Sequence, residues 1–108
     1  MGRHLADGSL AKLASLFPAA RPVDLPVRLT RIGGAGNGPE NVVIEFATPQ
    51  EVLFTCGTPL QFAECVRLQN SDGSLNEEAS VVAVQNHEGE IAVAARFLRK
   101  VAHWIVTR

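Results

Sequence analysis

Two cysteines and three histidines are the residues of this 108-residue chain best suited to nucleophilic or metal chemistry. A nucleophilic cysteine needs a basic neighbour that favours the thiolate, and the pattern fixes none beside Cys56 or Cys65. The histidines His4, His87 and His103 are far apart in the sequence, and none has a neighbour at the spacing of metal ligands. We therefore predict neither a catalytic residue nor a metal site.

Glu64 is the one acidic residue on an otherwise apolar predicted strand face. Burial there would raise its pKa and suit a general acid. A strand bulge, or a salt bridge to Arg67, is the interpretation that we favour. The chain also lacks a Gly-x-Ser-x-Gly elbow and a His-Glu-x-x-His helix, so the sequence indicates a protein without enzymatic activity.

The composition, 46% hydrophobic and 19% charged, is typical of a single globular domain. No apolar run approaches the roughly 20 residues needed to cross a bilayer, and the N-terminus lacks the apolar core of a secretory signal. These features predict a cytoplasmic protein without membrane insertion. In that compartment the two cysteines are expected to be reduced and packed, with a disulfide between them as the alternative.

Charge is distributed unevenly around the formal net charge of −1. Residues 1–31 hold five bases and two acids, Glu40–Glu90 holds nine acids and one base, and Arg96–Arg108 holds four bases and no acid. If the two ends met, they would form a basic region opposite an acidic body; scattered solvated charge is the alternative. A basic region would allow a nucleic-acid-binding small barrel. The aromatic residues argue against nucleic-acid binding, because all five phenylalanines fall on apolar stripes and few aromatic platforms remain for base stacking.

The segment Asn41–Leu68 organises the predicted fold, because apolar residues alternate along it in three runs. Tight turns at Thr48–Gln50 and Gly57–Pro59 separate the runs, which indicates an antiparallel meander. The residues that share a face in each run are Val42, Ile44 and Phe46; then Val52, Phe54 and Cys56; then Leu60, Phe62, Val66 and Leu68.

Further elements flank this segment. Residues 9–17 place leucines and a phenylalanine at helical spacing and end at Pro18, which predicts a short amphipathic helix. Arg21–Ile32 alternates as a strand, in which Pro26 indicates an edge position or a bulge. Gly33–Pro39 is predicted to be a hairpin connection rather than a phosphate loop, because it leads into a strand.

The C-terminal half continues with a polar connection over Gln69–Glu78 and two strands, Ser80–Asn86 and Ile91–Phe97, joined by a turn. Leu98–Arg108 fits a helix, with a continued strand as the alternative. In the helix, Trp104 would cap the barrel end or offer a stacking platform to a ligand.

Six strands between short helices predict a mainly β fold, a small antiparallel barrel or sandwich. We divide the chain into an N-terminal helical extension, residues 1–20, and a six-stranded barrel with a C-terminal helix, residues 21–108.

The order of these pieces resembles a PilZ domain, a small barrel that serves as a bacterial receptor for cyclic di-GMP. The resemblance runs from Arg21 to about Trp104 and rests on the strand RPVDLPVRL, the Gly-Thr-Pro-Leu turn, and the apolar strings FAECVRL, SVVAVQN and IAVAARF. It implies a six-stranded antiparallel β-barrel and cyclic di-GMP as the possible ligand.

The family binds that ligand through Arg-x-x-x-Arg before the first strand and Asp/Asn-x-Ser-x-x-Gly before a later one. Guanidinium forks pair with phosphates, and the second motif supplies polar groups and a close backbone approach. In this sequence Arg21 matches the second arginine, whereas Phe17 or Leu16 stands in place of the first. Aligning the second motif puts Phe46, Thr48 and Glu51 at the Asp, Ser and Gly positions, so only Thr48 is a conservative match.

The resemblance therefore implies a degenerate PilZ-like member, with weak or absent cyclic di-GMP binding and a role as a signalling or adaptor module that contacts a protein partner. The residues expected to meet any residual anionic ligand are Arg21, Arg28, Arg31 and Thr48. For Arg28 and Arg31, a plain surface role is the alternative. No cofactor is expected, and the oligomeric state is left open.

Overall fold

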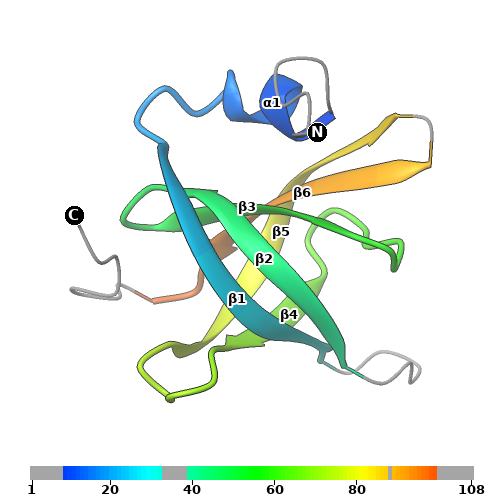
Figure 1. The fold of residues 1–108 in the computed structure, drawn as a ribbon. Helices are drawn as coiled ribbons and strands as arrows, with labels where there is room; N and C mark the ends of the chain where they lie inside the picture. Colours follow the sequence, from blue (N-terminus) through cyan, green and yellow to red (C-terminus); the bar gives the residue numbers. More distant parts are fainter. Residues whose placement is uncertain (1–8, 33–38, 88, 100–108) are drawn as a thin grey trace, which may run out of the picture.

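Six antiparallel strands close into a barrel in a computed structural model of the chain (Figure 1). The structure describes residues 9–32, 39–87 and 89–99. The order around the barrel is β1-β2-β3-β6-β5-β4. This confirms the predicted mainly β barrel with a short N-terminal helix. The bounds are α1 Ser9–Ala14, β1 Arg21–Arg31, β2 Glu40–Ala47, β3 Glu51–Cys56, β4 Cys65–Gln69, β5 Asn76–His87 and β6 Glu90–Phe97.

The barrel interior is filled by the apolar residues that alternate along each strand. In β6 the predicted face is confirmed, because Val93, Ala95 and Phe97 are buried in the core and Ile91 packs against it. The two alternations predicted for β1 and β3 also hold, with Val27 and Leu29, and Val52 and Phe54, pointing inward. The predicted C-terminal helix, including Trp104, lies outside the described residues.

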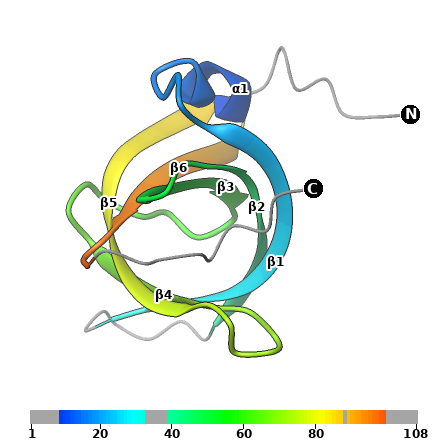
Figure 2. The same cartoon turned by 90° about the vertical axis from the view of Figure 1, so that its left-hand side faces the viewer.

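Helix α1 lies outside the barrel and packs against β3, β5 and β6 (Figure 2). Leu10 and Leu13 are buried there against Leu53, Ala92 and Ala94, which point outward from their strands. A six-residue helix is marginal alone, so this contact is what stabilises it. The helix is shorter than predicted, because the chain after Ala14 continues in a tighter turn that buries neither Ser15 nor Leu16.

The predicted three-stranded meander is wrong at its last strand. β3 pairs with β2 and β6, whereas β4 pairs with β1 and β5. β4 also begins only at Cys65, so Phe62 precedes it on a turn and is 73% exposed, not packed on the apolar face. Alternation reports which face of a strand is buried, but it does not report which strand lies beside it.

Strand pairing explains two further departures from the predicted strands. A shift between Ile44 and Phe46 in β2 turns Phe46 outward to the cluster under α1, although it was predicted to share a face with Ile44. β5 begins at Asn76 rather than at Ser80, because the polar start of the strand pairs with β4 and still places Ala79 inside.

Pro26 lies in the part of β1 that does not pair with β4. The edge-strand prediction is wrong, since β1 has a neighbour on each side, whereas the bulge alternative fits a register shift between Pro22 and Leu25. The Ile32 amide donates to the Cys65 carbonyl, so even-numbered residues here direct their backbone groups toward β4. Pro26 belongs to that series and has no N–H. The described β1–β4 ladder accordingly stops at Arg28.

The turn Gln61–Glu64 carries local strain that one substitution should relieve. Its Glu64 amide donates to the Gln61 carbonyl over 3.0 Å, and Ala63 has a φ of 71° at the third position, which favours glycine. We expect Ala63→Gly to raise the free energy of unfolding by about 1 kcal/mol, because the exposed methyl loses no packing. Urea unfolding measures this change, and a destabilised Ala63→Gly protein would contradict the strained conformation.

Candidate functional site

The β2–β3 hairpin brings together two of the four residues predicted to meet an anionic ligand. Arg21, the first residue of β1, pairs with Ala47 at the end of β2, so it lies beside the turn that starts at Thr48. Arg28 and Arg31 lie seven and ten positions further along the same strand. At about 3.3 Å per residue, a path of about 23 Å along the strand separates Arg28 from Arg21, and the path to Arg31 is longer. The four residues therefore do not form one site.

Thr48 is buried, and its hydroxyl is fully engaged within its own turn. Oγ1 accepts hydrogen bonds from the backbone amides of Gln50 at 3.1 Å and Glu51 at 2.8 Å, and it donates to Glu51 Oε1 at 2.5 Å. The Thr48 amide donates to the Glu51 carbonyl at 2.9 Å, which closes the hairpin. The hydroxyl thus shapes the turn rather than pointing to a free surface.

The turn is also fastened to β6. The second oxygen of Glu51 accepts hydrogen bonds from the Arg96 guanidinium at 2.8 Å, and the Phe97 amide donates to the Gln50 carbonyl at 2.8 Å. At the position where the PilZ motif has glycine, this chain therefore places an acidic side chain held in a network. Arg21, which lies beside this network, forms no ion pair with a described residue, whereas Arg96 is held by Glu51.

Removing the Thr48 hydroxyl should destabilise the hairpin. We expect Thr48→Val to lower the free energy of unfolding by about 1 to 2 kcal/mol, because two backbone amides lose their acceptor without a change of side-chain shape. Thr48→Ser keeps the hydroxyl and is the matched control. Chemical unfolding of both variants tests this, and equal stabilities would show that the hydroxyl does not hold the turn.

Glu64 pairs with Arg31, not with Arg67 as predicted. Glu64 accepts the Arg31 Nε–H, and its other oxygen accepts the Gln61 amide at 3.0 Å. The Arg31 side chain is 27% exposed and the Glu64 side chain is 14% exposed, so the ion pair is partly shielded from water. Burial alone would raise the pKa of Glu64, but the hydrogen bonds and charge of Arg31, with the Gln61 amide, together hold it below its ordinary value. A group held ionised in this way is a poor general acid.

The lowered pKa of Glu64 predicts a pH-dependent contribution to stability. A carboxylate whose folded-state pKa lies below the unfolded value stabilises the fold above the unfolded pKa, and this contribution is lost as the pH falls through the folded value. We expect Glu64→Gln to cost about 1 to 2 kcal/mol at neutral pH, and this cost to shrink as the pH falls below the ordinary carboxyl pKa of about 4.3 and through the lower folded-state value. Unfolding curves of both proteins across this range test the pair; a constant difference would contradict it.

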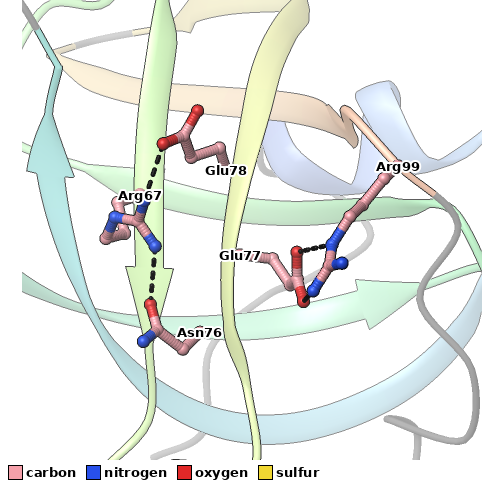
Figure 3. A network of polar contacts seen from close by, with 5 residues as sticks. All are labelled: Arg67, Asn76, Glu77, Glu78 and Arg99. Carbon is pink, nitrogen blue, oxygen red and sulfur yellow. Dashed lines mark hydrogen bonds and ion pairs between the residues drawn. The ribbon is translucent and has the colours of Figure 1, made fainter.

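Further arginines neutralise the acidic strand β5 (Figure 3). Arg67 donates to Asn76 Oδ1 at 2.8 Å and to Glu78 at 2.6 Å, while Arg99 holds both oxygens of Glu77 at 2.9 Å from the other side of β5. Arg99, like Arg31 and Arg96, is an arginine of the basic ends that lies against a glutamate of the acidic segment. Among the described residues, the predicted alternative of a basic region opposite an acidic body is not formed.

The two cysteines are free and half-buried on strands that do not pair with each other. Burial, followed by the charge of Glu40, raises the pKa of Cys56 to about 11, and its Sγ–H donates to the Thr58 carbonyl. Cys56 is therefore protonated at neutral pH and unsuited to attack as a thiolate. Within the part of the chain that the structure describes, no three potential metal ligands gather, and no helix is long and apolar enough to cross a membrane.

A surface groove of about 470 Å³, which was not predicted, lies where β1 and β4 part. Arg28 lies along it, flanked across the ladder by Asn41 of β2 and Gln69 of β4. The opposite wall is the β4–β5 turn. The lining residues are Leu25, Pro26, Val27, Arg28, Asn41, Gln69, Asn70, Ser71 and Asp72.

Comparison with solved structures supports the fold. The barrel is similar to the Bacillus subtilis inhibitor of motility, MotI/DgrA, with a TM-score of 0.60 and 13% sequence identity over 78% of this chain. The aligned part covers 43% of that protein, so this chain corresponds to less than half of its length. No family model matches the sequence. No curated protein sequence matches it either.

Proposed function

We propose that this chain is a non-enzymatic, PilZ-like regulatory module of the bacterial cytoplasm. It acts through contact with a protein partner and binds cyclic di-GMP weakly or not at all. The similarity to a protein named as an inhibitor of motility supports a regulatory role.

The arrangement around Thr48 is the observation that carries the nucleotide part of this proposal. A dinucleotide at this end would need donors from the turn, but the Gln50 and Glu51 amides already donate to the Thr48 hydroxyl, and that hydroxyl donates to the Glu51 carboxylate. The neighbouring carboxylate of Glu51 would meet phosphates with like charge. The first arginine of the family's motif is replaced by an apolar residue. Losing one bidentate arginine–phosphate pair costs about 2 to 3 kcal/mol, roughly a hundredfold in affinity.

Calorimetric titration of the full chain with cyclic di-GMP tests this proposal, with Arg21→Ala as the companion variant. We expect no saturable heat at micromolar ligand for either protein. Binding at micromolar or lower concentration that Arg21→Ala abolishes would overturn the proposal and indicate that the chain is a cyclic di-GMP receptor.

A further inference from the structure

Arg28 and Arg21 are the described arginines that form no ion pair with a described residue, and of the two Arg28 is the one that lines a groove. Arg31, Arg67, Arg96 and Arg99 each pair with a glutamate. Arg28 instead has the neutral amides Asn41 and Gln69 as its neighbours across β2 and β4, and it lies along the groove beside Pro26. A guanidinium between two carboxamides presents hydrogen-bond donors at one place and no competing carboxylate, which suits an incoming oxyanion.

The groove is a consequence of the strand chemistry. Pro26 cannot donate to β4, the described ladder stops at Arg28, and β4 ends at Gln69, beyond which the chain enters its hairpin turn. The far wall is held in shape by that turn. Asn70 donates to Ser74 Oγ at 2.7 Å and accepts the Leu75 amide at 3.0 Å, while Asp72 accepts the Ser74 amide at 2.9 Å. Hydrogen bonds therefore fix both walls of the groove, the strand ladder on one side and the bonds within the turn on the other.

The opposite wall carries a negative charge. The backbone amide and the hydroxyl of Ser74 hold the pKa of Asp72 below its ordinary value, so this carboxylate is ionised at neutral pH. The groove thus offers a cation on one wall and an anion on the other. A dianionic phosphate would be attracted by Arg28 and repelled by Asp72, whereas a partner with both signs of charge matches both walls.

The exposure of Arg28 decides between a free small molecule and a protein. An ion pair that stays in water contributes little, because solvent screens it. A protein surface that covers the groove would remove water from the guanidinium, and arginine is enriched among the residues that dominate such interfaces. Pro26 and its exposed cross-strand neighbour Val43 supply the adjacent apolar contact.

We propose that this groove is the docking site for the protein partner, which places an acidic side chain on Arg28 and a neighbouring basic side chain near Asp72. This inference rests on the proposed function, since it names the surface through which the module makes its protein contact. It uses a region of β1 that is remote from Arg21 and the Thr48 turn.

Selection of random short peptides displayed on phage, with the full chain as target and its Arg28→Ala variant as the counter-target, tests the inference. We expect the enriched peptides to contain Asp or Glu close to Lys or Arg. A synthetic peptide from this set should bind Arg28→Ala about tenfold or more weakly than the unaltered chain. It should bind Arg21→Ala, the matched exposed arginine on the same strand, as well as the unaltered chain.

A charge exchange gives the sharper result. Arg28→Glu should lose the peptide, and a peptide with its acid changed to Lys should regain binding to Arg28→Glu. Failure to enrich acidic peptides, equal binding by Arg28→Ala, or an absence of rescue would each overturn the inference. Thermal melting of the variants confirms that they fold, as expected for substitutions of an exposed side chain.

The two proposals fail in different ways. Tight, Arg21-dependent binding of cyclic di-GMP would overturn the proposed function, and the peptide experiment would then still decide whether the groove binds acidic segments. If no peptide bound in an Arg28-dependent way and cyclic di-GMP did not bind either, the docking surface would be overturned while the proposed function would stand.

Discussion

Replacing Phe54 by alanine is expected to lower the free energy of unfolding by about 3 to 5 kcal/mol, enough to unfold much of a marginally stable domain. Phe54 is fully buried in the barrel core, on β3, opposite Ile44 of β2 and Val93 of β6. Truncation leaves a cavity between three strands that are fixed by their ladders, so the surrounding side chains can fill it only in part. Denaturant unfolding followed by circular dichroism measures the loss.

The chain offers a matched control for this experiment. Phe62→Ala removes the same side chain from a position that is 73% exposed, so its cost should be within about 0.5 kcal/mol. A similar large loss in both variants would show that Phe62 is packed, and a small loss in both would mean that Phe54 does not lie in a closed core.

The second large effect is expected at the helix. Leu13→Ala should destabilise the protein by about 2 to 4 kcal/mol, because Leu13 is fully buried between α1 and the outer faces of the strands. The loss should appear in the same single unfolding transition as that of the barrel, since the helix and strands share this cluster.

Leu16→Ala is the control here, because Leu16 is 64% exposed at the end of the same segment. Its stability should match that of the unaltered chain. If Leu13→Ala were equally harmless, or if it produced a separate early transition, α1 would be a loosely attached extension rather than part of the fold.

Periodicity predicts this fold well where a strand keeps one register. β6 is such a case, since each of its alternating apolar residues points inward as expected. Periodicity fails at Phe46, because a bulge that depends on pairing with β3 reverses the face. It also fails at Phe62, where a turn interrupts what looks like a continuous alternation. The adjacency of β4 to β1 is likewise invisible in local sequence, because ladders join distant segments.

The candidate sites show the same limit. Arg21 and Thr48 were both expected to meet a ligand, and the hairpin does bring them close, but the bonds that occupy the Thr48 hydroxyl come from its local turn and could only be seen in three dimensions. The partner of Glu64 was predicted three residues away, at Arg67, yet it is Arg31, 33 residues away. The groove requires three strands in register, so no single stretch of sequence carries its signature.

The proposal that this barrel works without cyclic di-GMP is tested most directly by an amide NMR titration of the full chain with that nucleotide. If the Thr48 turn is closed to the ligand, the signals of Gln50, Glu51 and Arg21 will keep their positions at ligand concentrations well above micromolar. Saturable shifts of those three signals, absent from the Arg21→Ala spectrum, would contradict the proposal.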